Sequence, residues 1–152
     1  MNWNVLVASV AVIFSMTSYV LTRRKELAWK RTEFLYAQAQ YLENDPELVD
    51  VIRILEDRHP SLTMAQIFDA DSQLDYEKRA EYEQKFDKLF NFLWRLCYAY
   101  LEVKTLSSKE VEGFGWYFWL ISKFPAVVDY CENNGYEDIN IVTRKLGLDQ
   151  EG

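Results

Sequence analysis

The chain has 152 residues, of which 27% are charged and 49% hydrophobic, and its formal net charge is −7. This length fits one ordinary domain, and the composition excludes a wholly disordered chain and a collagen-like fibre. One His and two Cys leave little material for metal or thiol chemistry. We therefore expect no catalytic residue, no cofactor and no metal site.

Residues 1–22 contain no charged side chain. A helix from Trp3 to Leu21 would be about 28 Å long, close to the hydrocarbon thickness of a bilayer. Basic residues follow the apolar run, which favours a retained anchor over a cleaved signal peptide. The pattern predicts a single-pass transmembrane helix with the N-terminus outside and the remaining chain in the cytoplasm.

Small side chains recur along one face of this first segment. A face of this kind lets a second helix approach closely inside a membrane. The residues that we expect to pack in this way are Ala8, Ala11, Ser15 and Ser18.

Residues 23–45 are predicted to form a basic juxtamembrane helix. Five basic residues oppose Glu26 between residues 22 and 31, which gives +4, whereas the remaining 12 basic and 23 acidic residues give −11. An acidic body lacks the cationic surface that nucleic acids require, so we expect no nucleic-acid partner. The basic residues expected to set the topology and to meet lipid head groups are Arg23, Arg24, Lys25, Lys30 and Arg31.

Residues 46–152 are predicted to form an acidic helical domain. Asp45 is suited to cap a helix whose first residue is Pro46, and apolar residues at helical spacing continue it to about His59. Residues 61–68 suit one or two helical turns. A long helix is expected over residues 72–104, capped by Asp71 or Ser72.

The last third of the chain also follows helical patterns. Ser107 and Glu110 have capping-box spacing and open a predicted helix that continues through Ile121. Two short helices follow, over residues 125–133 and from about residue 138. The predicted fold is therefore all-α, with one transmembrane helix followed by a small cytoplasmic bundle of about five helices.

Aromatic residues are concentrated in two of these predicted helices. Successive helix positions differ by about 100°, so neighbouring aromatic side chains cannot all face one core. Ordinary core packing with some exposure and a partner-binding patch both remain open at this point. The residues that we expect to dock a partner are Trp94, Tyr98, Trp116 and Trp119.

Residues 89–136 resemble a bacterial family of small single-span membrane proteins that is known only as a domain of unknown function. The resemblance lies in Leu89-Phe90-Asn91-Phe92-Leu93, in the turn that leads to Ser107-Ser108-Lys109-Glu110-Val111, and in the aromatic helix that follows. An acidic residue expected soon after the Asn is missing here, where Trp94 and Arg95 stand. The resemblance implies an anchored helical domain without an established activity.

These patterns favour a membrane-anchored, non-catalytic helical interaction module, such as an accessory subunit or scaffold of a membrane complex. The expected partners are the lipid bilayer and either another membrane protein or a second copy of the chain. The alternative is a membrane-acting effector, a toxin or defence component, that oligomerises through its span.

Overall fold

The computed structural model describes residues 3–69 and 73–149, without the side chains of residues 4–6. Its contacts divide the chain into two units, residues 1–40 and residues 41–152. The first helix, α1 (Trp3–Asn44), provides all of the described part of the first unit and the start of the second. The described residues contain helices and no strand, so the all-α prediction is confirmed.

The predicted transmembrane helix is wrong. Among the described residues, no helix combines the length and the apolar character that crossing a membrane requires. Helix α1 continues without a break through Arg23 and Arg24. The prediction of a single-pass membrane protein with the N-terminus outside and a cytoplasmic domain depended on this transmembrane helix, so it is wrong as well.

The second unit begins with a capped helix, α2 (Pro46–Leu55). Asp45 accepts hydrogen bonds from the backbone N–H groups of Glu47 and Leu48 at 3.0 and 3.3 Å. Pro46 lies in the first turn of the helix. Backbone N–H groups there have no acceptor within the helix, so proline, which lacks an N–H, breaks no hydrogen bond. The predicted start of this helix is confirmed.

Seven described helices, α2–α8, follow α1, so the prediction of about five was too low. The chain forms the short α3 (Met64–Phe68), and the expected helix from Ser107 to Ile121 is divided into α5 (Ser108–Glu112) and α6 (Gly115–Ser122). The break lies at Gly113 and Phe114, because glycine has a low helix propensity. The last two helices are α7 (Pro125–Asn133) and α8 (Glu137–Lys145).

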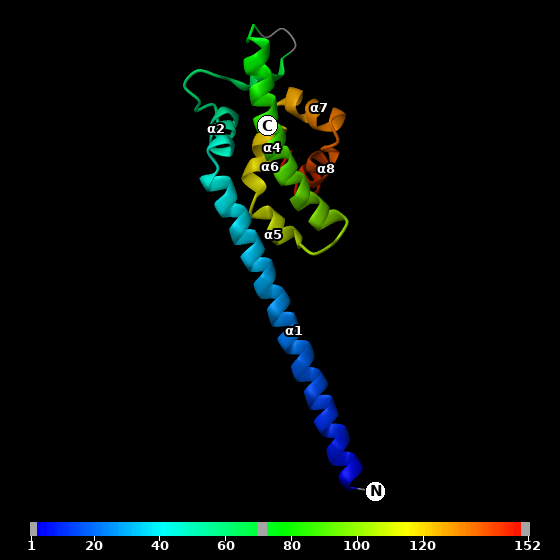
Figure 1. Ribbon diagram of the computed structural model, residues 1–152. Coiled ribbons are helices and arrows are strands. Elements are labelled where there is room, and N and C mark those ends of the chain that lie inside the picture. Colours follow the sequence, from blue (N-terminus) through cyan, green and yellow to red (C-terminus); the bar gives the residue numbers. More distant parts are fainter. Residues whose placement is uncertain (1–2, 70–72, 150–152) are drawn as a thin grey trace. The chain divides into compact units, whose positions relative to one another are not determined.

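Helix α4 (Tyr76–Leu101) is the centre of the second unit. It contacts α2, α3, α5 and α8, and Figure 1 shows α2 on one side of it and α7 with α8 on the other. Its N-cap is Asp75, whereas the expected caps, Asp71 and Ser72, lie outside the described residues. Complete burial of each large apolar side chain contributes roughly 1.5–3 kcal/mol. The fully buried side chains of α4 are Phe86, Leu89, Phe90, Leu93, Leu96 and Cys97.

Candidate interaction site

The best-formed candidate site is a pair of tryptophans on α6. The ring centroids of Trp116 and Trp119 are 4.6 Å apart, and the three-residue spacing places both on one helix face. The Trp116 side chain is 52% exposed, whereas Trp119 is half-buried beneath it. Both were predicted to dock a partner, and the structure brings them together.

Two charged side chains hold this tryptophan pair. The indole N–H of Trp116 donates to the Glu56 carboxylate at 3.2 Å, and Glu56 caps the end of α2. The Lys123 ammonium lies 3.3 Å from the centroid of the Trp119 ring, a cation–π contact. The sequence analysis predicted neither contact. Lys123 stands four residues after Trp119, so helical spacing could have revealed that pair. Glu56 is 60 residues from Trp116, so no local pattern connects those two residues.

The Trp119 indole N–H is buried and has no hydrogen-bond partner among the described residues. A buried donor left in this state costs roughly 1–3 kcal/mol. Nearby, burial raises the pKa of the Tyr117 phenol, and the charges of Glu43 and Glu56 raise it further. Tyr117 is therefore a neutral hydroxyl at physiological pH.

The other predicted docking pair lies on α4. The rings of Trp94 and Tyr98 are stacked with centroids 5.6 Å apart, and Tyr98 is 46% exposed. Trp94 donates a hydrogen bond to Asp138 on α8, while burial raises the pKa of that carboxyl. Trp94 thus joins two helices of the bundle, so it is anchored in the fold more firmly than Tyr98.

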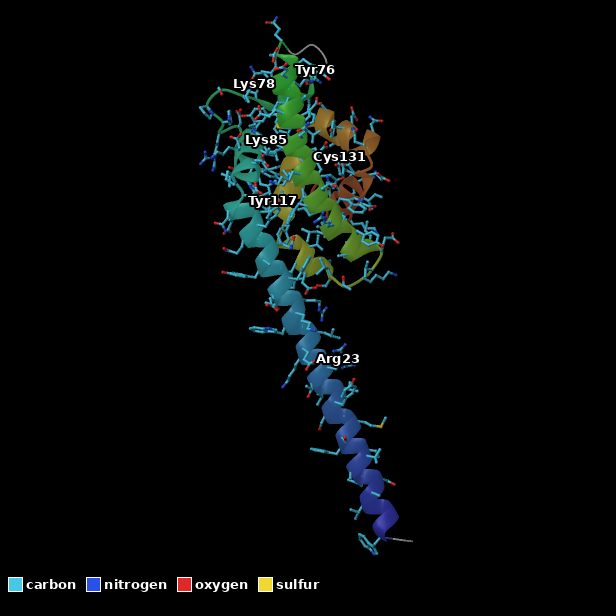
Figure 2. All side chains as sticks on the ribbon, viewed as in Figure 1. Arg23, Tyr76, Lys78, Lys85, Tyr117 and Cys131 are labelled. Carbon is cyan, nitrogen blue, oxygen red and sulfur yellow. The ribbon has the colours of Figure 1, made fainter. Side chains whose placement is uncertain are left out.

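His59 and Asp50 form the arrangement that most resembles catalytic machinery. His59 Nε2 lies 3.3 Å from Asp50 Oδ1, which matches the acid–base half of a hydrolase triad. However, His59 Nδ1 accepts hydrogen bonds from the backbone N–H groups of Ser61 and Leu62, at 3.2 and 3.0 Å. This geometry assigns the proton to Nε2 and leaves neither ring nitrogen available to activate a nucleophile. Lys85 also lies 3.7 Å from Asp50, on the side of α4 that faces α2 (Figure 2).

The two cysteines are buried in the second unit, Cys97 on α4 and Cys131 on α7. Figure 2 labels Cys131. Burial raises the pKa of both thiols, to about 12 for Cys131. Neither is a thiolate at physiological pH, so neither is a nucleophile in this environment. The described residues also contain no group of three or more His, Cys, Asp or Glu side chains that could hold a metal ion.

The predicted sites on α1 all lie in the first unit and are exposed. Two roles were predicted for them: the small residues would pack inside a membrane, and the basic residues would contact lipid head groups. Both roles depended on the transmembrane helix. Within this segment Arg23 pairs with Glu26 at 3.4 Å. The residues concerned are Ala8, Ala11, Ser15, Ser18, Arg23, Arg24, Lys25, Lys30 and Arg31.

No protein-family model, curated protein or solved structure matches the chain. The resemblance to a family of unknown function therefore stays a prediction.

Proposed function

We propose that residues 41–152 form a non-catalytic protein-interaction module and that Trp116 is its anchor residue. The observation that carries this proposal is the exposed Trp116 ring, which packs against the Trp119 ring with centroids 4.6 Å apart and is hydrogen-bonded to Glu56. A large aromatic side chain already fixed before binding loses little conformational entropy on association. Such tryptophans are enriched among the residues that contribute most to binding.

The charge of this unit supports a protein partner with a basic surface. Residues 41–152 contain 12 basic and 22 acidic side chains, a formal charge of −10. Complementary charge increases the rate of encounter and selects among partners. The same negative charge disfavours nucleic acid, whose phosphates would be repelled.

The catalytic inventory supports a non-enzymatic role. His59 has both ring nitrogens engaged, and the thiols of Cys97 and Cys131 are buried. A nucleophile–base pair is therefore lacking among these three residues. The effector alternative required oligomerisation through a membrane span, so it is not retained.

Site-specific photo-cross-linking tests the proposal. A benzophenone amino acid replaces Trp116 in the full chain, and a second variant carries it at Tyr76, the most exposed aromatic of this unit at 82%. Irradiation in the producing cells is expected to give one dominant adduct from position 116 and none of that mass from position 76. Equal labelling from both positions, or no adduct from 116, would contradict the proposal.

A further inference from the structure

An apolar cleft is lined by Asp57 and Phe124, which directly follow Glu56 and Lys123, the two residues that contact the tryptophan pair. It has a volume of about 590 Å³, within the range of ligand-binding pockets, and lies between the loop after α2, α3 and the start of α7. The apolar lining includes Ile54, Met64, Phe68, Phe124, Pro125 and Val127.

The rim of this cleft is acidic. Asp57 and Asp69 line it, both side chains are exposed, and no basic residue is among those that line it. Neither carboxylate has an ion pair or a side-chain hydrogen bond within the described residues. The rim therefore offers two exposed carboxylates beside an apolar hollow, although the Arg79 guanidinium donates to the Asp69 backbone carbonyl at 3.3 Å.

Asp57 occupies a backbone conformation that glycine would adopt more easily. Its φ is +56°, and the Arg58 N–H donates to the Arg53 carbonyl at 2.8 Å to close the turn after α2. Aspartate enters this left-handed region more readily than most residues with a side chain, and the Asp57 carboxylate has no ion pair or hydrogen bond within the described residues. The exposed Asp57 carboxylate is therefore available to a binding partner.

Helix α1 carries a surface with the opposite charge. Leu27 is 46% exposed, and all four of its neighbours at three and four residues along the helix are basic. These neighbours are Arg23, Arg24, Lys30 and Arg31. The surface is thus an apolar side chain with cationic groups around it, and residues 1–40 have a formal charge of +3, from five basic and two acidic residues.

We propose that the cleft receives Leu27 of a second copy of the chain, with Asp57 and Asp69 paired to the basic residues around it. The apolar lining takes the leucine, and the acidic rim selects its cationic surroundings over uncharged apolar helices. This inference rests on the proposed function in one respect only, that this end of the module is a binding surface. It adds the identity of the occupant.

A charge-exchange experiment on the full chain tests the pairing. One variant carries Asp57→Lys with Asp69→Lys, and the other carries Arg24→Glu with Arg31→Glu. Lysine at position 57 is compatible with the backbone, because Lys104 adopts a φ of +55° in this same protein. Sedimentation velocity over a concentration series measures the self-association of each variant and of the equimolar mixture.

Each variant alone is expected to associate at least tenfold more weakly than the native chain, and the mixture is expected to recover native association within about threefold. The matched controls reverse the same charges elsewhere. Glu102→Lys with Glu112→Lys changes two exposed acids away from the cleft, and Lys25→Glu changes a basic residue two positions from Leu27 and so on another face. These controls are expected to associate as the native chain does.

A variant that relaxes the backbone separates binding from folding. Asp57→Gly removes the carboxylate and the strain together, so it is expected to weaken association while circular dichroism and thermal stability are unchanged or improved. A native chain that stays monomeric, or a mixture that does not recover association, would overturn the inference. If the chain is monomeric but position 116 cross-links to another protein, the inference fails and the proposed function stands.

Discussion

Lys88 on α4 places its ammonium 2.7 Å from Oδ2 of Asp45, while Oδ1 of the same carboxylate caps α2. Glu47 also lies 2.7 Å from Lys88. The hydrogen bond from Lys88 lowers the pKa of Asp45, and the N–H groups at the start of α2 lower it further. One carboxylate thus ends a helix and joins it to the central helix of the bundle.

The pH dependence of stability should change when Asp45 is replaced. Because its pKa lies below the ordinary 3.8 only in the folded chain, its ionised form stabilises the fold above about pH 4, and this contribution is lost as the pH falls toward the folded pKa. Asp45→Asn keeps a capping side chain, so urea denaturation should show a smaller loss of stability between pH 5 and pH 3. Asp45→Ala removes the capping side chain too, so its free energy of unfolding at pH 7 should be about 1 kcal/mol lower than that of the native chain. An unchanged pH profile in Asp45→Asn would contradict this assignment.

His59 should stabilise the loop that leads to α3 through its Nδ1 atom. His59→Ala leaves the N–H groups of Ser61 and Leu62 without this acceptor, and it is expected to cost about 1–2 kcal/mol. His59→Asn should retain most of the stability, because an asparagine oxygen accepts from N–H groups two or three residues ahead. Amide hydrogen exchange at Leu62 measures the effect, and equal exchange in native and alanine chains would exclude the role.

The unpaired indole N–H of Trp119 predicts an unusual order of substitution effects. Trp119→Phe removes the buried donor and keeps an aromatic ring under Lys123, so its cost in unfolding free energy should be below about 1 kcal/mol. Trp119→Ala removes the ring against which Trp116 packs and should cost about 2–3 kcal/mol. Chemical denaturation gives both values; equal costs would show that the N–H carries a compensating bond.

The cysteines should be inert until the second unit unfolds. With a pKa of about 12, the Cys131 thiol is ionised to about one part in ten thousand at pH 8, against roughly a quarter for an unperturbed thiol. Iodoacetamide should therefore alkylate Cys131 more than a thousandfold more slowly in the native chain than in urea. Mass spectrometry of timed samples measures this ratio, and rapid native labelling would contradict the buried environment.

Local chemistry made much of the helical structure predictable. Asp45-Pro46 marked the start of α2, the spacing of Phe86, Leu89 and Phe90 marked the buried face of α4, and Asn134 with Gly135 marked the end of α7. These signals act within about one helical turn, where neighbouring residues decide the backbone. The break before α6 was missed because a capping box identifies where a helix begins and gives no information about its length.

The interaction site was less predictable, because its parts meet only through tertiary packing. Trp116 and Trp119 could be selected from their residue types, but the Glu56 contact joins residues from two helices far apart in the chain. The bond between His59 and Asp50 and the cleft beside α3 arise in the same way. At the N-terminus the sequence led to a wrong prediction. A run of apolar residues was interpreted as a separate membrane span, but it is part of the continuous helix α1.

The role of Trp116 is tested most directly by comparing partner recovery by chains that differ at one exposed ring. Tagged native chain, Trp116→Ala, and the control Tyr76→Ala are purified after mild cross-linking, and co-purified proteins, including untagged copies of the chain, are quantified by isotope labelling. If Trp116 is the anchor residue, Trp116→Ala should lose at least tenfold of the main partner while its circular dichroism stays native, and Tyr76→Ala should lose none. Equal recovery from all three chains would contradict this role.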